Sequence, residues 1–236
     1  MTHPDIKGSL PQVDQEKLQR LTDAMNVFNM ITAGDADLVR PGAEHHGVEV
    51  IERGVEGPLS YGNYNRLSCQ NPSQDAARAA RAETVVLICE DYRQSGQYTR
   101  ERFYGRSRGT LARGTQVEVP QNALIITSAG GPAEFDSTRY AAHRDLLAAI
   151  FAANPSANFE LVTHTGVCGG IAHQTNRENA KILEQQGAPA EHKYMDSYVV
   201  KLIKDLQRSG VPNSQMKGLV AVVENDQYKG VKPVKV

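Results

Sequence analysis

The sequence predicts an α/β fold with a mostly parallel central sheet, flanked by helices and preceded by an N-terminal helical arm. The sequence contains three continuous apolar runs that have the length of buried strands: Thr84 to Cys89, Ala123 to Thr127 and Phe159 to His164. Segments with helical character separate them. Apolar strands that alternate with helices are typical of a parallel sheet covered on both faces. A chain of 236 residues is long enough for one sizeable core.

The N-terminal part predicts one amphipathic helix. Apolar residues recur at helical spacing from Asp14 to Thr32, with Asp14 available as the N-cap. Residues 34–72 are rich in Gly, Pro and polar residues, with a strand-like alternation from Val48 to Ile51, and we assign them no compact fold. We therefore divide the chain into an arm with an irregular extension, 1–82, and an α/β domain, 83–236, which together form one compact unit.

The rest of the chain supplies the helices between the strands and a closing hairpin. Periodicity and turn residues predict helices at Gln74–Arg81, Ser137–Ala153, Ala172–Gln186 and around Val199–Leu206, then a strand Gly218–Val223, a turn Glu224–Gln227 and a short return.

Charge and composition favour a small-molecule partner. The chain has 26 basic and 27 acidic residues, a net charge of −1, and no long block of one sign, unlike a nucleic-acid or membrane-surface binder. Without a basic leader or an apolar span, we expect a soluble, cytoplasmic protein. The arginine- and aromatic-rich segment 94–119 could bind single-stranded nucleic acid. We interpret it instead as an insertion that caps a pocket or reaches a partner subunit.

Two of the three cysteines stand at the ends of predicted strands. Cys89 ends one strand, and Cys168 follows His164 at the end of another. Two thiols and an imidazole are ligands that Zn²⁺ prefers, and three protein ligands leave one tetrahedral position for water. We therefore predict a catalytic zinc site in domain 83–236. An odd number of cysteines does not make a disulfide framework, and Cys69, in a polar stretch, is interpreted as a free thiol.

Charged residues accompany the first thiol. Asp91 and Arg93 alternate with Cys89, so a carboxylate and a guanidinium stand where the strand ends. Such an ion pair would hold its partners beside a metal, and the alternative is a surface salt bridge. His173 is the alternative ligand to His164.

The other histidines suggest no further site. His45 and His46 are adjacent, so on a strand they would point to opposite faces, and we interpret them as surface residues. His143, His173 and His192 could each carry protons, but a surface role is the simpler interpretation.

The pattern Cys-x-Asp-x-Arg, followed far along the chain by a His shortly before Cys-Gly, resembles the β-class carbonic anhydrases. The resemblance covers roughly Glu83 to Val231. That family typically has two residues between the histidine and the second cysteine, whereas three stand between His164 and Cys168. Its Arg-Asn pair before a small-residue turn is replaced by Thr127 and Ser128.

The resemblance implies a fold and a reaction. It implies a β-carbonic anhydrase-like α/β fold, and reversible hydration of CO2 to bicarbonate by a zinc-bound hydroxide, with Cys89, His164 and Cys168 as ligands. Asp91 and Arg93 would form a dyad that orients the metal-bound water, or Asp91 would itself bind zinc and block the site. Gly130 and Gly131 would form the turn that lines the pocket, although a helix-capping role needs no ligand. The family also implies a homodimer or higher homo-oligomer, with the N-terminal helix wrapping the neighbour.

Other functions remain open from the sequence. The same fold could hydrolyse carbonyl sulfide or carbon disulfide, or the chain could be a noncatalytic relative, a zinc-stabilised structural or assembly protein that retained the fold. A redox protein that uses Cys89 and Cys168 lacks the short Cys-x-x-Cys spacing.

Overall fold

The chain folds around a six-stranded sheet with strand order β1-β3-β2-β4-β5-β6. The strands are β1 (Gly47–Ile51), β2 (Thr84–Cys89), β3 (Ala123–Ser128), β4 (Asn158–His164), β5 (Met216–Glu224) and β6 (Gln227–Pro233). The computed structural model describes residues 14–32, 47–51, 76–77, 79–89, 123–128, 130–133, 137–165, 168, 188–225 and 227–235, with only the backbone of β1, Ser137, residues 188–192 and Tyr194.

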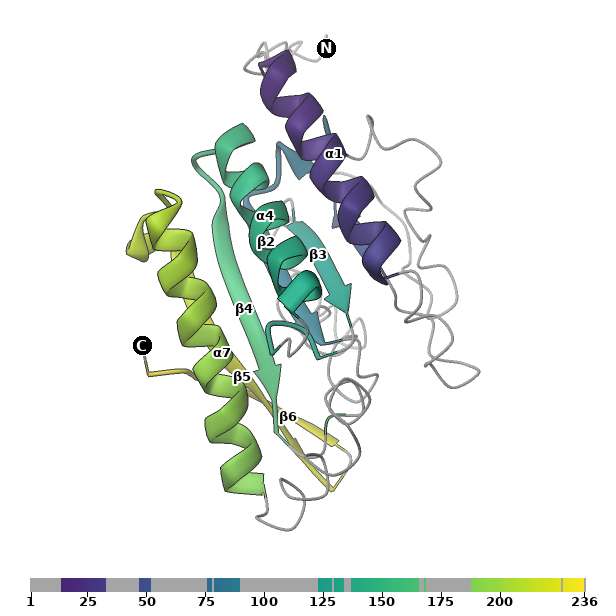
Figure 1. Cartoon of the computed structure of the whole chain (residues 1–236). Coiled ribbons are helices and arrows are strands. Elements are labelled where there is room, and N and C mark those ends of the chain that lie inside the picture. Colours follow the sequence, from purple (N-terminus) through teal and green to yellow (C-terminus); the bar gives the residue numbers. More distant parts are fainter. Residues whose placement is uncertain are drawn as a thin grey trace, which may run out of the picture.

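The four central strands run parallel, and the two edge strands run antiparallel to them. β2 pairs in parallel with β3 on one side and with β4 on the other, and β4 pairs in parallel with β5. At one edge, β1 pairs antiparallel with β3. At the other edge, β6 pairs antiparallel with β5, and Figure 1 shows these two strands side by side in yellow. The predicted α/β class and mostly parallel sheet are confirmed.

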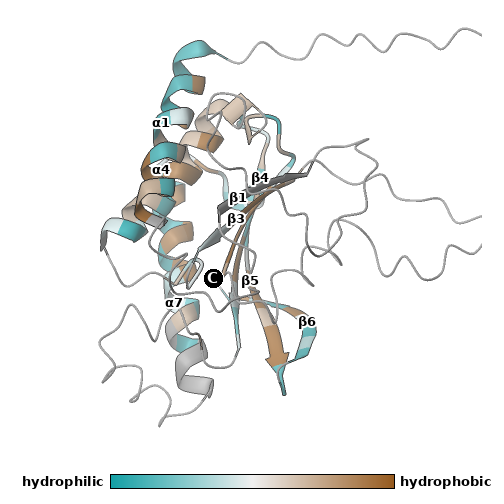
Figure 2. Ribbon diagram, turned by 90° about the vertical axis from the view of Figure 1, so that its right-hand side faces the viewer, coloured by the Kyte–Doolittle hydropathy of each residue, from teal (hydrophilic) through white to brown (hydrophobic). Residues whose placement is uncertain are grey.

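The described long helices lie together on one face of the sheet (Figure 2). They are α1 (Gln15–Thr32), α4 (Ser137–Ala153) and α7 (Ala188–Arg208), and a short 3-10 turn, η2 (Asn213–Gln215), leads into β5. None of the described helices is long and apolar enough to cross a membrane. The predicted helix Ala172–Gln186 lies outside the described residues, and of Gln74–Arg81 residues 76–77 and 79 are helical.

Side chains alternate between the two faces of the sheet along each strand, so the core has two layers. On β2, Val85 and Leu87 belong to the main core beneath the helices, whereas Val86 and Ile88 belong to a second apolar cluster on the opposite face. Successive strand residues point to opposite faces, so a strand that is apolar throughout is buried on both. Every residue of β2 and β3 is buried, which explains their continuous apolar runs.

Helix α1 begins at the predicted cap and packs within its own chain. The Glu16 backbone N–H donates to the Asp14 carboxylate over 2.9 Å, so Asp14 caps the helix. Leu21, Met25 and Phe28 are buried in the main core, where α1 packs against α4. The apolar stripe that suggested a dimerisation arm is thus covered by the chain itself, and dimerisation through α1 stays a prediction.

Candidate metal centre

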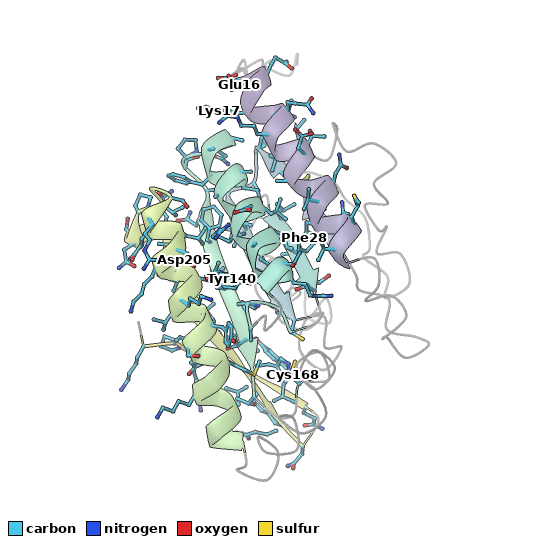
Figure 3. The ribbon with its side chains drawn as sticks, viewed as in Figure 1. Glu16, Lys17, Phe28, Tyr140, Cys168 and Asp205 are labelled. Carbon is cyan, nitrogen blue, oxygen red and sulfur yellow. The ribbon has the colours of Figure 1, made fainter. Side chains whose placement is uncertain are left out.

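The carboxyl ends of β2 and β4 bring three metal-ligating side chains together. Cys89 is the last residue of β2, and His164 is the last residue of β4, the strand beside it. Cys168 follows shortly and lies beyond the end of β4 (Figure 3). Ligand sites of open α/β sheets lie at this edge, because the carboxyl ends of parallel strands meet there. Strands β2 and β4 are neighbours in the sheet, as a metal site shared by their ends requires.

The three ligand atoms are close enough to share one metal ion. They all lie within 4.8 Å of one another, and the three side chains are buried. The Cys89 and Cys168 sulfurs are 3.7 Å apart, and the two cysteines form no disulfide with each other. A disulfide requires about 2.05 Å between sulfurs. Two thiolates at about 2.3 Å from a tetrahedral ion would lie about 3.8 Å apart, so the observed separation fits ligation.

Thr165 fixes the orientation of the histidine. His164 Nδ1 lies 3.0 Å from the Thr165 carbonyl oxygen, which can only accept, so Nδ1 carries the proton. The other nitrogen, Nε2, then has the lone pair that a metal ion needs. The Thr165 hydroxyl donates to the Val223 carbonyl over 2.7 Å and accepts from the Val223 N–H over 2.6 Å. Strand β5 therefore holds the residue that orients the imidazole.

The surroundings of the thiols are apolar. Cys89 and Cys168 form a small buried cluster with Ala133 and with Met195 from α7, and Tyr198 packs against it. The hydrogen bond to the Cys168 thiol and then burial raise the pKa of the Cys89 thiol well above its usual value, while the His164 imidazole opposes them. In such surroundings two thiolates need a compensating positive charge, and a divalent cation supplies it.

A glycine turn packs against the backbone of Cys89. Gly130 and Gly131 follow β3 with φ of +87° and +56°, and the Gly131 N–H donates to the Ser128 carbonyl over 3.0 Å. A Cβ on Gly131 would lie 2.5 Å from the Cys89 backbone nitrogen and 2.9 Å from the Ile88 carbonyl carbon. Only glycine permits this approach. The predicted role of both glycines in lining a substrate pocket stays a prediction.

The remaining predicted residues are distributed as follows. The structure does not describe the predicted dyad, the inserted segment, the third cysteine or four of the histidines. These are Asp91, Arg93, segment 94–119, Cys69, His45, His46, His173 and the side chain of His192. The surface interpretation of His143 was wrong, because the side chain is 2% exposed and lies between α4 and β3. His143 lies in the buried stripe of α4 that includes Tyr140 and Leu147. The helical spacing of these three residues could have predicted that His143 is buried.

The sequence did not predict the contact between Thr165 and His164, or the hydrogen bond between Ser128 Oγ and His143 Nε2, which are 2.7 Å apart. The alternation of side chains along β3 indicates that Ser128 is buried beneath the helices, because Ser128 shares a face of the strand with Leu124 and Ile126. Thr165 carries no such signal, since its partner Val223 is far away in the sequence.

Comparisons with protein-family models, with curated proteins and with solved structures found no match for the chain. Within the described part of the chain, Cys89, His164 and Cys168 form a buried group that could hold a metal ion.

Proposed function

We propose that the chain is a zinc-dependent carbonic anhydrase that interconverts CO2 and bicarbonate. The observation that carries the proposal is the buried Cys89–His164–Cys168 group, with its sulfurs 3.7 Å apart, at the carboxyl edge of a parallel sheet. The separation is the one expected for two thiolates on a tetrahedral ion with bonds of about 2.3 Å, the length typical of zinc.

The donor set favours zinc among the common divalent ions. Thiolates and imidazole are soft or borderline ligands, whereas magnesium and calcium take oxygen ligands. Two thiolates and one neutral imidazole carry a total charge of −2, so a divalent cation makes the buried group neutral. A neutral group suits the apolar contacts with Ala133 and Met195.

Three described ligands suit a catalytic rather than a structural ion. Structural zinc sites use four protein ligands, whereas catalytic sites use three and keep one position open. When bound there, zinc would supply a Lewis acid that lowers the pKa of a water in the open position to about 7. The described residues hold the ligand geometry, since Gly131 supports Cys89 and Thr165 orients His164. Asp91 and Arg93 stay the predicted dyad that would orient the water.

Zinc analysis combined with stopped-flow CO2 hydration tests the proposal. We expect about one zinc per chain, as three ligands on one chain imply, and rapid hydration, both lost in Cys89→Ser. A matched control is Cys69→Ser, which changes the cysteine interpreted as a free thiol and should keep both. Stoichiometric zinc without hydration would contradict the anhydrase assignment, and the carbonyl sulfide and carbon disulfide alternatives would then be assayed on the same protein. Absence of zinc from protein supplied with it would contradict the metal mechanism.

A further inference from the structure

A buried serine–histidine pair lies next to the candidate metal centre. Ser128 Oγ and His143 Nε2 are 2.7 Å apart, and the side chains are 1% and 2% exposed. His143 Nδ1 is 2.7 Å from the Arg139 carbonyl oxygen, which can only accept a hydrogen bond. Nδ1 therefore carries the ring proton, and Nε2 accepts from the Ser128 hydroxyl. Both nitrogens of a neutral imidazole are thus used, and the serine has one fixed orientation.

The pair is adjacent to the first ligand in the sheet. Ser128, the last residue of β3, stands in register with Cys89, the last residue of β2. Residues paired in parallel strands point to the same face, and two positions earlier Leu87 and Ile126 both enter the main core beneath the helices. Ser128 and Cys89 therefore share the helix-covered face.

The turn after β3 connects the pair to the Cys89 backbone. The Ser128 carbonyl accepts from the Gly131 N–H over 3.0 Å, and the Gly131 Cα packs against the Cys89 nitrogen so closely that no Cβ fits between them. A shift of Ser128 would move this turn. Because Gly131 contacts the Cys89 nitrogen, the turn also limits the positions that the Cys89 backbone can take.

Helix α1 supports the other side of the histidine. The Phe28 ring meets the His143 ring edge-on, with centroids 5.1 Å apart and an interplanar angle of 88°. Phe28 is fully buried and is directed from α1 toward α4 (Figure 3). Packed side chains thus hold His143 against Ser128.

We propose that Ser128 and His143 are positioning residues for the metal centre. Their hydrogen bond holds the Ser128–Gly131 turn against Cys89, and so keeps the thiol at ligand distance from Cys168 and His164. The inference depends on the proposed function in one respect, which is that these three side chains bind a metal. Partners outside the ligand set commonly alter metal affinity by about 10-fold to 100-fold.

Cobalt-substituted protein tests the inference, because thiolate-to-cobalt absorption reports the ligand geometry directly. Ser128→Ala removes the hydroxyl, and Ser128→Thr retains it. We expect Ser128→Ala to shift the cobalt spectrum and to weaken zinc binding in a chelator competition by about 10-fold or more. Ser128→Thr should keep the wild-type cobalt spectrum and zinc affinity. His143→Gln keeps an acceptor for the serine and should resemble wild type, while His143→Leu should resemble Ser128→Ala.

Tyr140→Phe is the matched control for lost stability. Tyr140 lies on the same helix and donates to the Asp205 carboxylate over 2.7 Å, away from Cys168 (Figure 3). This variant should lower the melting temperature without changing the cobalt spectrum or the zinc affinity. An unchanged spectrum and affinity in both Ser128→Ala and His143→Leu would overturn the inference, as would an equal loss of affinity in Tyr140→Phe. Wild-type protein without a thiolate-to-cobalt band would overturn the proposed function, and this inference with it.

Discussion

At the scale of single residues, the raised pKa of Cys89 makes metal binding depend on pH. The Cys168 thiol and burial keep Cys89 protonated in the metal-free protein at neutral pH. A thiol must lose its proton to bind a metal, so zinc competes with protons below that raised pKa. We expect the apparent zinc affinity to rise with pH through the neutral and mildly alkaline range, by about tenfold per unit for each proton released.

A chelator competition between pH 6 and 9 measures this dependence. The control is Cys89→Ser, in which any residual zinc binding should respond less to pH. An affinity for wild-type protein that stays constant across the range would contradict thiol ligation.

Thr165 supplies a second prediction at this scale. Thr165→Val keeps the shape of the side chain but removes both hydrogen bonds with Val223, which weakens the support of the carbonyl that orients His164. We expect zinc affinity to fall by about tenfold. Thr163→Val is the matched control, because its buried hydroxyl donates to the Leu219 carbonyl and makes no described contact with His164. Equal zinc affinities in the two variants, by chelator competition, would contradict this role of Thr165.

At the scale of elements, the turn after β3 is the most sensitive connection. Gly131→Ala would add strain at φ +56° and place a Cβ 2.5 Å from the Cys89 nitrogen, a backbone atom that cannot turn away. Gly210→Ala adds strain at φ +93° alone, since its nearest neighbour is a Phe151 ring atom at 4.0 Å. We expect each variant to lose about 1–3 kcal/mol from backbone strain. The loss should be larger in Gly131→Ala.

Zinc content and denaturant unfolding distinguish the two glycines. Gly131→Ala should also lose zinc, because the clash displaces Cys89, whereas Gly210→Ala should retain it. Full zinc occupancy in Gly131→Ala would show that the turn does not support the ligand.

The sequence predicted the elements whose signal is local. The strand Thr84–Cys89 and the helix Ser137–Ala153 have the predicted bounds, because a continuous apolar run and an intact helical stripe are both short-range patterns. The ends of two apolar strands likewise predicted that Cys89 and His164 would meet.

Features that depend on distant partners were not predicted. β1 joins the sheet as an antiparallel edge strand beside β3, although its neighbours in sequence gave no reason to assign it a place. The Ser128–His143 bond joins a strand to a helix, so the local patterns that indicate burial of each residue do not show that the two side chains meet. The carboxylate and guanidinium of Asp91 and Arg93 lie outside the described residues, so their predicted dyad stays a prediction.

At the scale of the whole molecule, a shared metal would couple its two central strands. Cys89 and His164 come from neighbouring strands but are 75 positions apart in the sequence (164 − 89). A metal that binds only the folded chain stabilises it by about 2.7 kcal/mol when its free concentration is 100 times the dissociation constant. We therefore expect chelation of zinc to lower the melting temperature of wild-type protein.

Thermal unfolding with and without a chelator checks this prediction. Cys89→Ser should melt at one temperature under both conditions, because it lacks a complete ligand set. A wild-type melting temperature that does not respond to the chelator would show that the metal contributes nothing to the fold.

X-ray absorption at the zinc edge tests most directly whether Cys89, His164 and Cys168 bind zinc and leave one position open. The account predicts two sulfur ligands at about 2.3 Å and two nitrogen or oxygen ligands at about 2.0–2.1 Å, with one sulfur lost in Cys168→Ser. Four sulfur ligands, or a spectrum that Cys168→Ser leaves unchanged, would contradict it.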